Sequence, residues 1–412
     1  MLNGTPRRSK DLNNETVLPE IRGGQQRSSP DRDETTRKNR RRVSEHASRS
    51  NSLSNGYNTD SSTSLSNRGI VGLRNLGNTC FMNSVIQCLS NTRLLRDYCR
   101  RDEHKDEVNK TTSNMKGALI NAFANLMHSI WKGAPDTHVS PNDFKSQIAR
   151  FAKRFVGYNQ QDAQEFLMYL LEGLHEDVNR VKEKRKNRIY DEDDSKTVSA
   201  QEMWKMYLHQ NDSKIVDIFV GQLKSSLTCT GCGHVSDTFD PFWDLSLPIK
   251  KGHGYGNDVS LESCFELFTS EEVLDGDEKP MCSKCKKRQK CTKSFSIQRF
   301  PKVLIIHLKR FNQDSSYRSK LSTMVNFPLQ SLELNQFAAE KNGAPAMYNL
   351  FAVSNHSGTP FGGHYTAYTK HPETSTWHHF SDTRVSQISE SQVQSSEAYV
   401  LFYELVDHSS RL

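Results

Sequence analysis

Cys80 is the residue whose setting most clearly suggests chemistry, and it ends a stretch rich in glycine and asparagine, GLRNLGNTC at positions 72–80. Apolar residues follow at helical spacing and predict a helix with the cysteine in its first turn: Val85, Ile86 and Leu89. The amides and dipole of that turn favour a thiolate, the reactive form of cysteine. Asn75 lies on the preceding turn, where its side-chain amide can donate to a developing oxyanion. The alternative interpretation is a buried, inert cysteine behind a tight turn.

A cysteine nucleophile requires a general base, and His364 has the most suitable setting of the fifteen histidines. Gly362 and Gly363 precede it and permit close backbone approach, and the alternation that follows predicts a strand that holds the imidazole rigidly. A third group should orient the ring, and the candidates are Asp382 and Ser381. We favour Asp382, because a carboxylate stabilises an imidazolium better than a hydroxyl does. The order of these groups along the chain is that of papain-type thiol proteases.

Two CxxC pairs have the spacing of zinc knuckles: Cys229 with Cys232, and Cys282 with Cys285. Four thiolates suit a closed tetrahedral site for one Zn²⁺ ion, which would be structural because no position is left for water. The long separation of the pairs predicts that the metal clips the ends of a two-stranded excursion. Unmetallated thiols and a redox pair are the alternatives, and the redox interpretation lacks a thioredoxin-like βαβ context. Two other cysteines have no assigned role, Cys264 and Cys291.

The chain has 412 residues, enough for two or three domains and a sizeable core. Its hydrophobic content of 34% is low for a chain folded throughout, so part of it is expected to be disordered. No apolar run approaches the roughly 20 residues of a membrane span, and the N-terminus lacks the apolar core of a signal peptide. We therefore expect a cytoplasmic or nuclear protein, in which clustered cysteines indicate metal binding and catalysis. The net charge of +7 does not by itself indicate nucleic-acid binding.

Residues 1–68 are rich in serine, arginine and asparagine, and we predict that they form a disordered basic tail. Within this tail, RKNRRR at 37–42 is typical of a nuclear-import signal, and RRVS at 41–44 is typical of a basophilic kinase site. The alternative is a solvated tail with neither role. The composition changes at Gly69, so residues 69–406 are interpreted as a catalytic domain and residues 407–412 as a short C-terminal tail.

The folded part begins with predicted helices and continues with predicted strands. After the helix of Cys80, apolar stripes predict helices near residues 119–130, 141–155, 163–178 and 203–208. From Ile215 the apolar period shifts towards two, and strands are expected over most of the remainder. The run VLIIHL at 303–308 predicts a central buried strand, with His307 packed in the core. Helices followed by strands predict an α+β fold.

Together, these motifs resemble those of the ubiquitin-specific proteases. The resemblance covers residues 70–405 and rests on the cysteine box at 72–84, QQDAQEF at 160–166, the CxxC pairs, KRF at 309–311, GGHYTAY at 362–368 and AYVLFY at 398–403. It implies a papain-like, hand-shaped fold with a helical thumb that carries Cys80 and a β-rich palm that carries His364. Zinc-clipped fingers, at about residues 216–300, would grip the body of ubiquitin.

The resemblance also implies roles for single residues. Asn75 matches the oxyanion-hole amide of the family, and Asp162 matches a position that contacts basic residues of the ubiquitin tail. That tail would enter between thumb and palm, where the glycines at 362–363 suit a narrow cleft. The family usually has asparagine or aspartate at the position of Ser381, so this chain departs from the pattern. The choice between Ser381 and Asp382 as the group that orients the histidine is therefore open.

The activity that the resemblance implies is deubiquitination by thiol-dependent hydrolysis of isopeptide, peptide or ester bonds at the C-terminal glycine of ubiquitin. Ubiquitin and ubiquitylated proteins would be the partners and one structural Zn²⁺ the cofactor. A monomer is expected, with neither nucleic acid nor a membrane as a partner. The alternatives are a protease for a ubiquitin-like modifier and a catalytically inactive ubiquitin-binding scaffold. Because Cys80 and His364 are both present, the scaffold is the weaker alternative.

Overall fold

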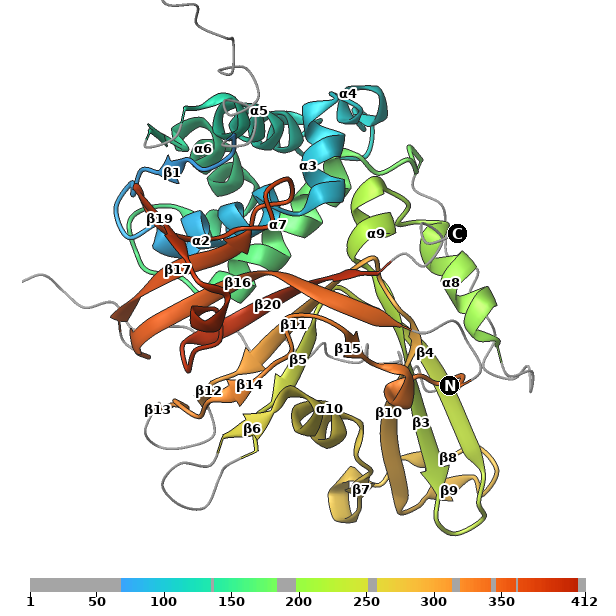
Figure 1. Cartoon of the computed structure of the whole chain (residues 1–412). Coiled ribbons are helices and arrows are strands. Elements are labelled where there is room, and N and C mark those ends of the chain that lie inside the picture. The colour runs from blue at the N-terminus through green and yellow to red at the C-terminus, as the bar shows by residue number, and fades with distance from the viewer. Residues whose placement is uncertain are drawn as a thin grey trace, which may run out of the picture. The chain divides into compact units, whose positions relative to one another are not determined.

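The structure of the protein is a computed structural model that describes residues 68–134, 137–183, 198–250, 258–312, 319–341, 346–360 and 362–406. These residues belong to the compact unit Asn58–Leu412, and the fold given below is that of this unit. Helices gather in its N-terminal part and strands in its C-terminal part, which confirms the α+β prediction (Figure 1). The import-signal and kinase-site motifs at 37–44 and the predicted tail at 407–412 lie outside the described residues.

The thumb, which comprises the helical residues 80–219, is built around α2 (Cys80–Ser90), and every residue of α2 is buried. The other α-helices of the described residues are α3 (Arg93–Arg100), α4 (His104–Glu107), α5 (Ala118–Lys132), α6 (Asn142–Phe151), α7 (Ala163–Asp177), α8 (Ala200–Leu208), α9 (Lys214–Phe219) and α10 (Leu261–Thr269). The apolar patterns predict α2, α5, α6, α7 and α8. The patterns do not predict the other four, of which α9 and α10 lie in the part of the chain where strands were expected.

The palm is an eight-stranded sheet of order β19-β18-β17-β16-β20-β11-β5, with β15 paired to β16. Its strands are β5 (Leu245–Pro248), β11 (Val303–Lys309), β15 (Leu332–Glu333), β16 (Met347–Thr359), β17 (Gly362–Lys370), β18 (Trp377–Ser381), β19 (Arg384–Ile388) and β20 (Ala398–Leu405). The predicted central strand is confirmed: β11 lies between β20 and β5, and its apolar run is buried. His307 of this strand is packed edge-on against Tyr399, and its Nδ1 atom lies 2.8 Å from Oγ of Ser246.

The fingers are a four-stranded sheet of order β4-β3-β10-β7, extended by the hairpin β8–β9. Their strands are β3 (Gly221–Cys229), β4 (Val235–Phe242), β7 (Glu272–Leu274), β8 (Met281–Cys282), β9 (Lys287–Arg288) and β10 (Cys291–Arg299). The prediction of a two-stranded excursion is therefore wrong in the number of strands. Helix α10 joins fingers and palm, because its Phe265 shares one apolar core with Ile297 of β10 and Leu304 of β11.

Three short ladders complete the described strands: β1 (Gly72–Leu73) with β2 (His138–Val139), β6 (Val259–Ser260) with β14 (Val325–Asn326), and β12 (Phe311–Asn312) with β13 (Ser319–Lys320). The ladder of β1 and β2 matters most for the site, because β1 opens the segment that leads into α2.

Helix α2 is fixed between the thumb and the palm. On the thumb side, the ring of Phe81 packs edge-on against the ring of Phe166 of α7, with 5.4 Å between the centroids. On the palm side, Oγ of Ser84 lies 3.0 Å from Oγ of Ser354 on β16. An apolar core that contains side chains of α2, α7, β17 and β18 surrounds these contacts. The start of α2 is therefore held rigidly against the palm.

The stretch after Ile215 differs from its prediction, because residues 214–219 form α9 and not a strand. Ser213 caps this helix, and its hydroxyl accepts a hydrogen bond from the Val216 backbone amide at 3.1 Å. The buried residues follow the helical spacing i, i+1, i+3 and i+4: Ile215, Val216, Ile218 and Phe219. The β-branched residues suggested alternation, but packing on two sides decided the local structure. The fingers consequently begin at Gly221 and not at about residue 216.

A buried carboxylate, Asp177, ties the end of α7 to the start of α5. One oxygen accepts hydrogen bonds from the Ser113 hydroxyl at 2.6 Å and the Gly117 amide at 2.9 Å. The other accepts from the amides of Leu119 and Ile120 at 2.9 and 3.0 Å. These amides belong to the first turn of α5, which has no partners for them within the helix. Asp177 therefore acts as a cap supplied from another helix.

We expect Asp177→Ala to lower the free energy of unfolding by about 3 kcal/mol, because it leaves four buried donors without an acceptor. Asp177→Asn keeps one carbonyl oxygen and should lose less. Urea denaturation followed by tryptophan fluorescence measures both variants against the parent protein. If the two variants lost equal free energy of unfolding, the two carboxylate oxygens of Asp177 would not contribute separately to stability.

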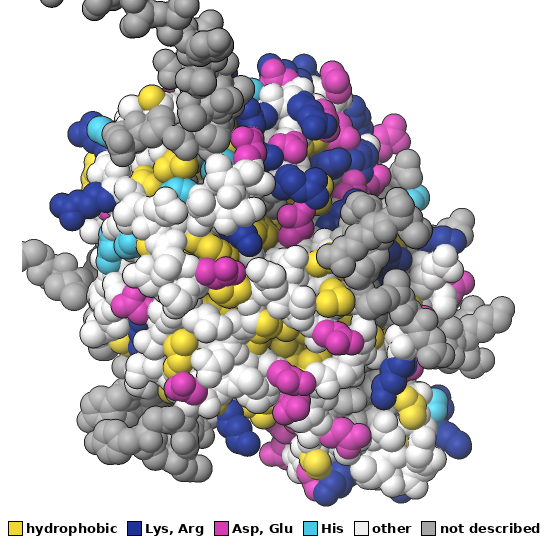
Figure 2. Space-filling model, viewed as in Figure 1, with side chains coloured by type: hydrophobic (Ala, Val, Ile, Leu, Met, Phe, Trp, Pro, Cys, Tyr) yellow, Lys and Arg dark blue, Asp and Glu magenta, His cyan; other side chains and the backbone are white. Residues whose placement is uncertain are grey.

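Charges of both signs mix on the surface. Figure 2 shows Lys and Arg side chains interspersed with Asp and Glu over α3 and α4. Arg180 illustrates the mixture, because its guanidinium makes ion pairs with Glu107, Asp212 and Asp217 at 2.8–3.1 Å.

Within the described ranges, no helix is both long enough and apolar enough to cross a membrane.

Candidate active site

Cys80 is the first residue of α2, as predicted, and only 3% of its surface is exposed. Burial raises the pKa of the Cys80 thiol above its usual 9.0. The backbone amide of Tyr365 acts in the opposite direction, and the negative charge of Asp382 raises the pKa again. The sequence led us to expect a thiolate favoured by the helix start. In the free protein the loss of hydration outweighs the helix amides, and the thiol form is favoured.

We expect alkylation of Cys80 by iodoacetamide to accelerate from pH 7 to about pH 9 without levelling off, because only the thiolate reacts and a raised pKa keeps it scarce. Mass spectrometry of the peptide that contains Cys80 separates this reaction from that of the other cysteines. A rate that is already constant near pH 7 would mean that the thiolate is formed in the free protein.

His364 lies on β17, the strand that packs against α2. Its Nε2 atom lies 2.9 Å from Oγ of Ser381, at the end of the neighbouring strand β18. When Nε2–H donates to this hydroxyl, Nδ1 carries the lone pair that a general base needs. Among the described residues, the Cys80 sulfur makes no hydrogen bond with His364. Such contacts are often long in unliganded thiol enzymes and tighten when substrate binds.

The structure places Ser381, and not Asp382, against His364, contrary to the preference based on charge. Asp382 lies in the two-residue turn between β18 and β19, with a φ of 51°. Adjacent residues at a strand end point to opposite faces, so only one of the two can meet the histidine. The Asp382 carboxylate instead accepts hydrogen bonds from Nδ2 of Asn75 at 3.0 Å and Nδ2 of Asn83 at 2.8 Å.

Asn75 is fixed at both ends of its side-chain amide. Its Oδ1 accepts hydrogen bonds from the backbone amides of Gly77 and Thr79 at 2.9 and 3.1 Å. Its Nδ2 donates one hydrogen bond to Asp382, and an amide nitrogen has two hydrogens. The second N–H is therefore available on the turn that leads into Cys80. An oxyanion hole requires a donor that is oriented before the reaction begins, and the Asn75 amide is held in this way.

Asn83 was not predicted as a site residue. It lies one helical turn after Cys80, is 2% exposed, and its Nδ2 donates to Asp382. A polar residue at this spacing within the cysteine box, on a helix with an otherwise apolar face, is the signal that would have identified it. Asn83 and Asn75 together hold the Asp382 carboxylate from two sides.

The turn at Asp382 is pressed onto β1, the strand that opens the cysteine box. The Leu73 amide donates to the Asp382 carbonyl oxygen at 2.8 Å. A Cβ atom at Gly72 would lie 2.4 Å from the carbonyl oxygen of Thr383. Only glycine permits this approach, so Gly72 allows the turn to reach the segment that carries Asn75.

Asp162 is both a helix cap and a link to the palm. Its Oδ1 accepts hydrogen bonds from the amides of Gln164 and Glu165 at 2.8 and 3.1 Å, at the start of α7. Its Oδ2 accepts a hydrogen bond from the hydroxyl of Tyr399 on β20 at 2.6 Å. A carboxylate has further acceptor positions, so this arrangement is compatible with the predicted contact to a basic substrate residue.

Gln160 spans the gap between the thumb and the strand of His364. Its Nε2 donates to the Gly363 carbonyl oxygen at 3.1 Å, and its Oε1 accepts from the Gly363 amide at 3.3 Å. Gly363 cannot carry a side chain, because a Cβ atom would lie 2.2 Å from the Ser357 carbonyl oxygen and 2.4 Å from Nε2 of His356. The motif predicted the glycines of this strand, Gly362 and Gly363, but not the glutamine that pairs with them.

The structure brings the four predicted metal ligands together at the end of the fingers. All four sulfurs lie within 4.8 Å of one another. The sulfurs of Cys229 and Cys285 are 3.9 Å apart, and those of Cys232 and Cys282 are 3.7 Å apart. Cys229 ends β3 and Cys282 ends β8, so the cluster joins the main finger sheet to the β8–β9 hairpin. These four thiols could hold a metal ion.

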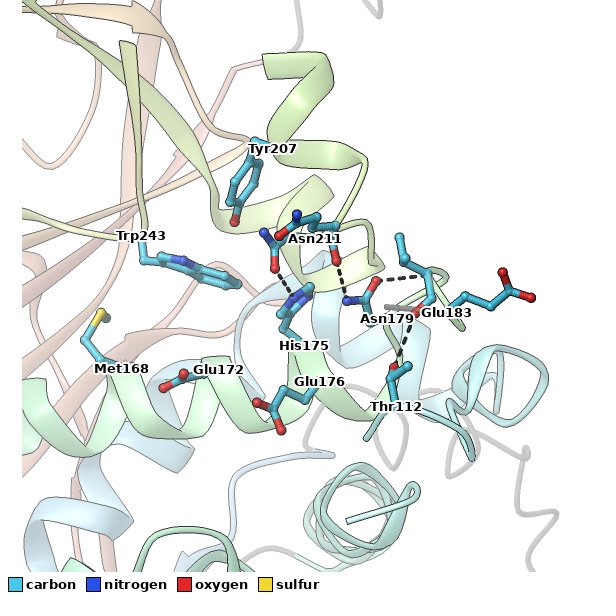
Figure 3. Close-up of a pocket in the computed structure, with 12 residues that line it drawn as sticks. Thr112, Met168, Glu172, His175, Glu176, Asn179, Glu183, Tyr207, Asn211 and Trp243 are labelled. Carbon is cyan, nitrogen blue, oxygen red and sulfur yellow. Dashed lines mark hydrogen bonds between the residues drawn. The ribbon is translucent and has the colours of Figure 1, made fainter. Parts of the chain in front are cut away.

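A separate cavity of about 750 Å³ opens between α7, α8 and the segment that joins β4 to β5. Trp243 and Tyr207 contribute aromatic rings to its lining, and Glu172 of α7 lies on the side of Trp243 opposite to Tyr207 in this view (Figure 3). Burial raises the pKa of Glu172 and lowers that of His175, which is held by Ser213 through a 2.8 Å contact at Nδ1. None of the predicted site residues lines this cavity.

A cysteine at a helix start, a histidine on a facing strand and a third group on that histidine are the arrangement of papain-like thiol hydrolases. The family model described as ubiquitin carboxyl-terminal hydrolase matches residues 71–403. The chain belongs to the ubiquitin carboxyl-terminal hydrolase family, which confirms the resemblance found in the sequence.

Individual relatives show how far the similarity extends. The chain is 56% identical over 365 residues to ubiquitin carboxyl-terminal hydrolase 2 of Homo sapiens, covering 88% of this chain and 59% of that protein. It is 56% identical over 349 residues to the Gallus gallus protein of the same name, covering 84% of this chain and 96% of that protein. The chain thus spans about three-fifths of the human relative. The solved SAGA DUB module bound to ubiquitin aldehyde matches with a TM-score of 0.65 and 26% identity, over 83% of this chain and 71% of that chain.

Proposed function

We propose that this protein is a deubiquitinating thiol hydrolase that cleaves isopeptide, peptide or ester bonds at the C-terminal glycine of ubiquitin. The observation that carries the proposal is the oriented amide of Asn75 on the turn before Cys80, beside a palm strand that holds His364. Nucleophile, base and oxyanion donor thus lie on adjoining segments, because the turn of Asn75 leads into α2 and α2 packs against β17. The family match over residues 71–403 and a ubiquitin-bound structural relative support ubiquitin as the substrate.

The reaction would follow the chemistry of thiol acyl transfer. Nδ1 of His364 takes the proton of Cys80, and the thiolate attacks the carbonyl of the terminal glycine. The free N–H of Asn75 donates to the oxyanion, a contribution of about 3 kcal/mol in comparable sites. His364 then protonates the leaving amine, and it later activates the water that hydrolyses the thioester. Ser381 acts as a positioning residue that keeps the proton of the imidazole on Nε2.

The route of the ubiquitin tail would pass between Asp162 on the thumb and the glycines at 362–363 on the palm. Gln160 crosses this route in the free protein and uses both backbone hydrogen-bonding groups of Gly363. An extended peptide would need the same groups, because strand pairing uses one N–H and one C=O. Binding of the tail therefore requires that the amide of Gln160 move aside.

We expect Gln160→Ala to raise the association rate of ubiquitin about fivefold. In the parent protein the hydrogen bonds of Gln160 to Gly363, with a net energy of about 1 kcal/mol, must break before the tail enters, and the variant lacks them. Stopped-flow fluorescence with labelled ubiquitin and the inactive Cys80→Ala background isolates this step from catalysis. Gln161→Ala is the matched control, because that side chain contacts Arg154 and not the palm. An unchanged association rate for Gln160→Ala would contradict the obstruction.

The proposal includes one structural Zn²⁺ ion at the finger cysteines. Tetrahedral zinc with Zn–S bonds of about 2.3 Å places its sulfurs about 3.8 Å apart. Two of the six sulfur pairs, at 3.7 and 3.9 Å, match this spacing, and all four sulfurs lie within 4.8 Å of one another. Four thiolates leave no open position on the metal, so the ion would fix the fingers and take no part in hydrolysis.

A ubiquitin whose C-terminus ends in an electrophile tests the proposed activity. We expect it to form a covalent adduct with the parent protein and none with Cys80→Ala. The same electrophile on a ubiquitin-like modifier should react much more slowly. Preferential labelling by that modifier would favour the alternative protease, and no adduct with either reagent on folded, zinc-loaded protein would favour a scaffold.

A further inference from the structure

We propose that Cys291 is a fifth thiol of the finger metal site, and that it takes the place of Cys229 as a ligand when the Cys229 sulfur is lost. The sequence assigned no role to Cys291. This inference rests on the proposed zinc site but not on the proposed activity, because each of its measurements reports metal binding.

The register of the fingers places Cys291 directly opposite Cys229. The two residues are paired across the antiparallel strands β3 and β10. The next pair, Thr230 and Lys290, is joined by a hydrogen bond from the Thr230 amide to the Lys290 carbonyl oxygen at 3.0 Å. Hydrogen-bonded and non-hydrogen-bonded pairs alternate along such a ladder, so Cys229 and Cys291 form a non-hydrogen-bonded pair.

This kind of pair brings side chains close together. Opposed Cα atoms in a non-hydrogen-bonded pair are about 4.5 Å apart, and both side chains project from the same face of the sheet. The Cys229 sulfur belongs to the four-thiol cluster. The Cys291 side chain therefore leaves the sheet beside the corner of the metal site that Cys229 occupies. In the register of the described strands, Cys229 is the ligand that faces β10, whereas Cys282 pairs with Lys287 of β9.

The surroundings of Cys291 keep its thiol available to the metal. The residue is 1% exposed and shares a small cluster with Cys229 and Cys282, separate from the main cores. Its sulfur donates a long hydrogen bond, of 3.5 Å, to the Gln289 carbonyl oxygen. A thiol is a weak donor, so this contact does little to prevent rotation towards the metal. Cys264, by contrast, is buried in the core of α10 and the palm.

Metal content of cysteine variants tests the proposal. Cys229→Ser should retain about one zinc per chain, with affinity lowered roughly 10- to 100-fold. Cys232→Ser should lose its zinc under the same conditions, because no thiol of β10 lies opposite Cys232. The double variant that combines Cys229→Ser with Cys291→Ser should also lose its zinc. With Co²⁺ in place of Zn²⁺, Cys229→Ser should keep the charge-transfer intensity of four thiolates. Zinc loss from Cys229→Ser as complete as from Cys232→Ser would overturn the proposal.

A second measurement does not depend on the folding of a ligand variant. Cys291→Ala retains all four primary ligands, and its zinc content should equal that of the parent protein. Its transfer of zinc to a colorimetric chelator should be about tenfold faster, because no thiol recaptures the metal when the Cys229 bond opens. Cys264→Ala is the matched control and should transfer zinc at the parent rate. Equal rates for Cys291→Ala and the parent would mean that Cys291 only fills space.

Discussion

Asp382→Ala should lower kcat for a ubiquitin–fluorophore substrate about 100- to 1,000-fold, the usual cost of removing one oxyanion donor. The Asp382 carboxylate accepts a hydrogen bond from Nδ2 of Asn75 at 3.0 Å. In the proposed mechanism this bond orients the second N–H of Asn75 towards the oxyanion. KM should change little, because the effect arises in the transition state. Thr383→Ala, at the exposed neighbouring position of the same turn, is the control and should retain full activity.

Double variants separate this role from an effect on the histidine. If Asp382 acts through Asn75, the double variant Asn75→Ala with Asp382→Ala should have the same activity as the less active of the two single variants. Ser381→Ala combined with Asp382→Ala should instead show the product of the two single losses. Ser381→Ala alone should cost less, because a hydroxyl only orients the ring. A Ser381→Ala loss far above that of Asp382→Ala would mean that orientation of the His364 ring contributes more to catalysis than orientation of the Asn75 amide.

Removal of the finger metal should unfold the distal fingers while the rest of the fold persists. Zinc in small thiolate sites contributes on the order of 10 kcal/mol to folding at neutral pH. The cluster joins the β3 end to the β8–β9 hairpin, whose own strands have two residues each. Without metal, we expect limited proteolysis to cut near Cys229 and Cys285.

Restoring the metal is the control for this experiment. Protein treated with a chelator and then given equimolar Zn²⁺ should recover its resistance to proteolysis, and Cys282→Ser should not recover. The palm, whose strands pack in two large apolar cores, should remain resistant throughout. Unchanged resistance of the fingers after complete zinc removal would mean that the sheet is stable on its own.

The parts of the site that the sequence predicted are those set by local patterns. Cys80 at a helix start and His364 on a strand after two glycines follow from turn chemistry and periodicity. The two CxxC pairs define their own metal geometry, so their convergence at the end of the fingers was also predictable.

The remainder depends on geometry that no local pattern contains. On the basis of charge, we expected Asp382 to contact the histidine. In the structure Asp382 lies in a turn, and Ser381 makes the contact with His364. The pairing of Gln160 with Gly363 joins residues that lie far apart in the chain, and it could be found only after thumb and palm were placed. Residues 214–219 carry β-branched side chains, yet a Ser213 cap and burial on two sides produce a helix.

The burial of Cys80 also determines how the protein withstands oxidative damage. Peroxides attack thiolates, and the sulfinic acid that follows further oxidation is irreversible for most proteins. A thiol with a raised pKa and 3% exposure reacts slowly, so the resting protein protects its nucleophile. Activation on substrate binding would then confine the vulnerable thiolate to the period when the cleft is occupied. Exposure to peroxide should accordingly inactivate the protein faster during turnover than at rest.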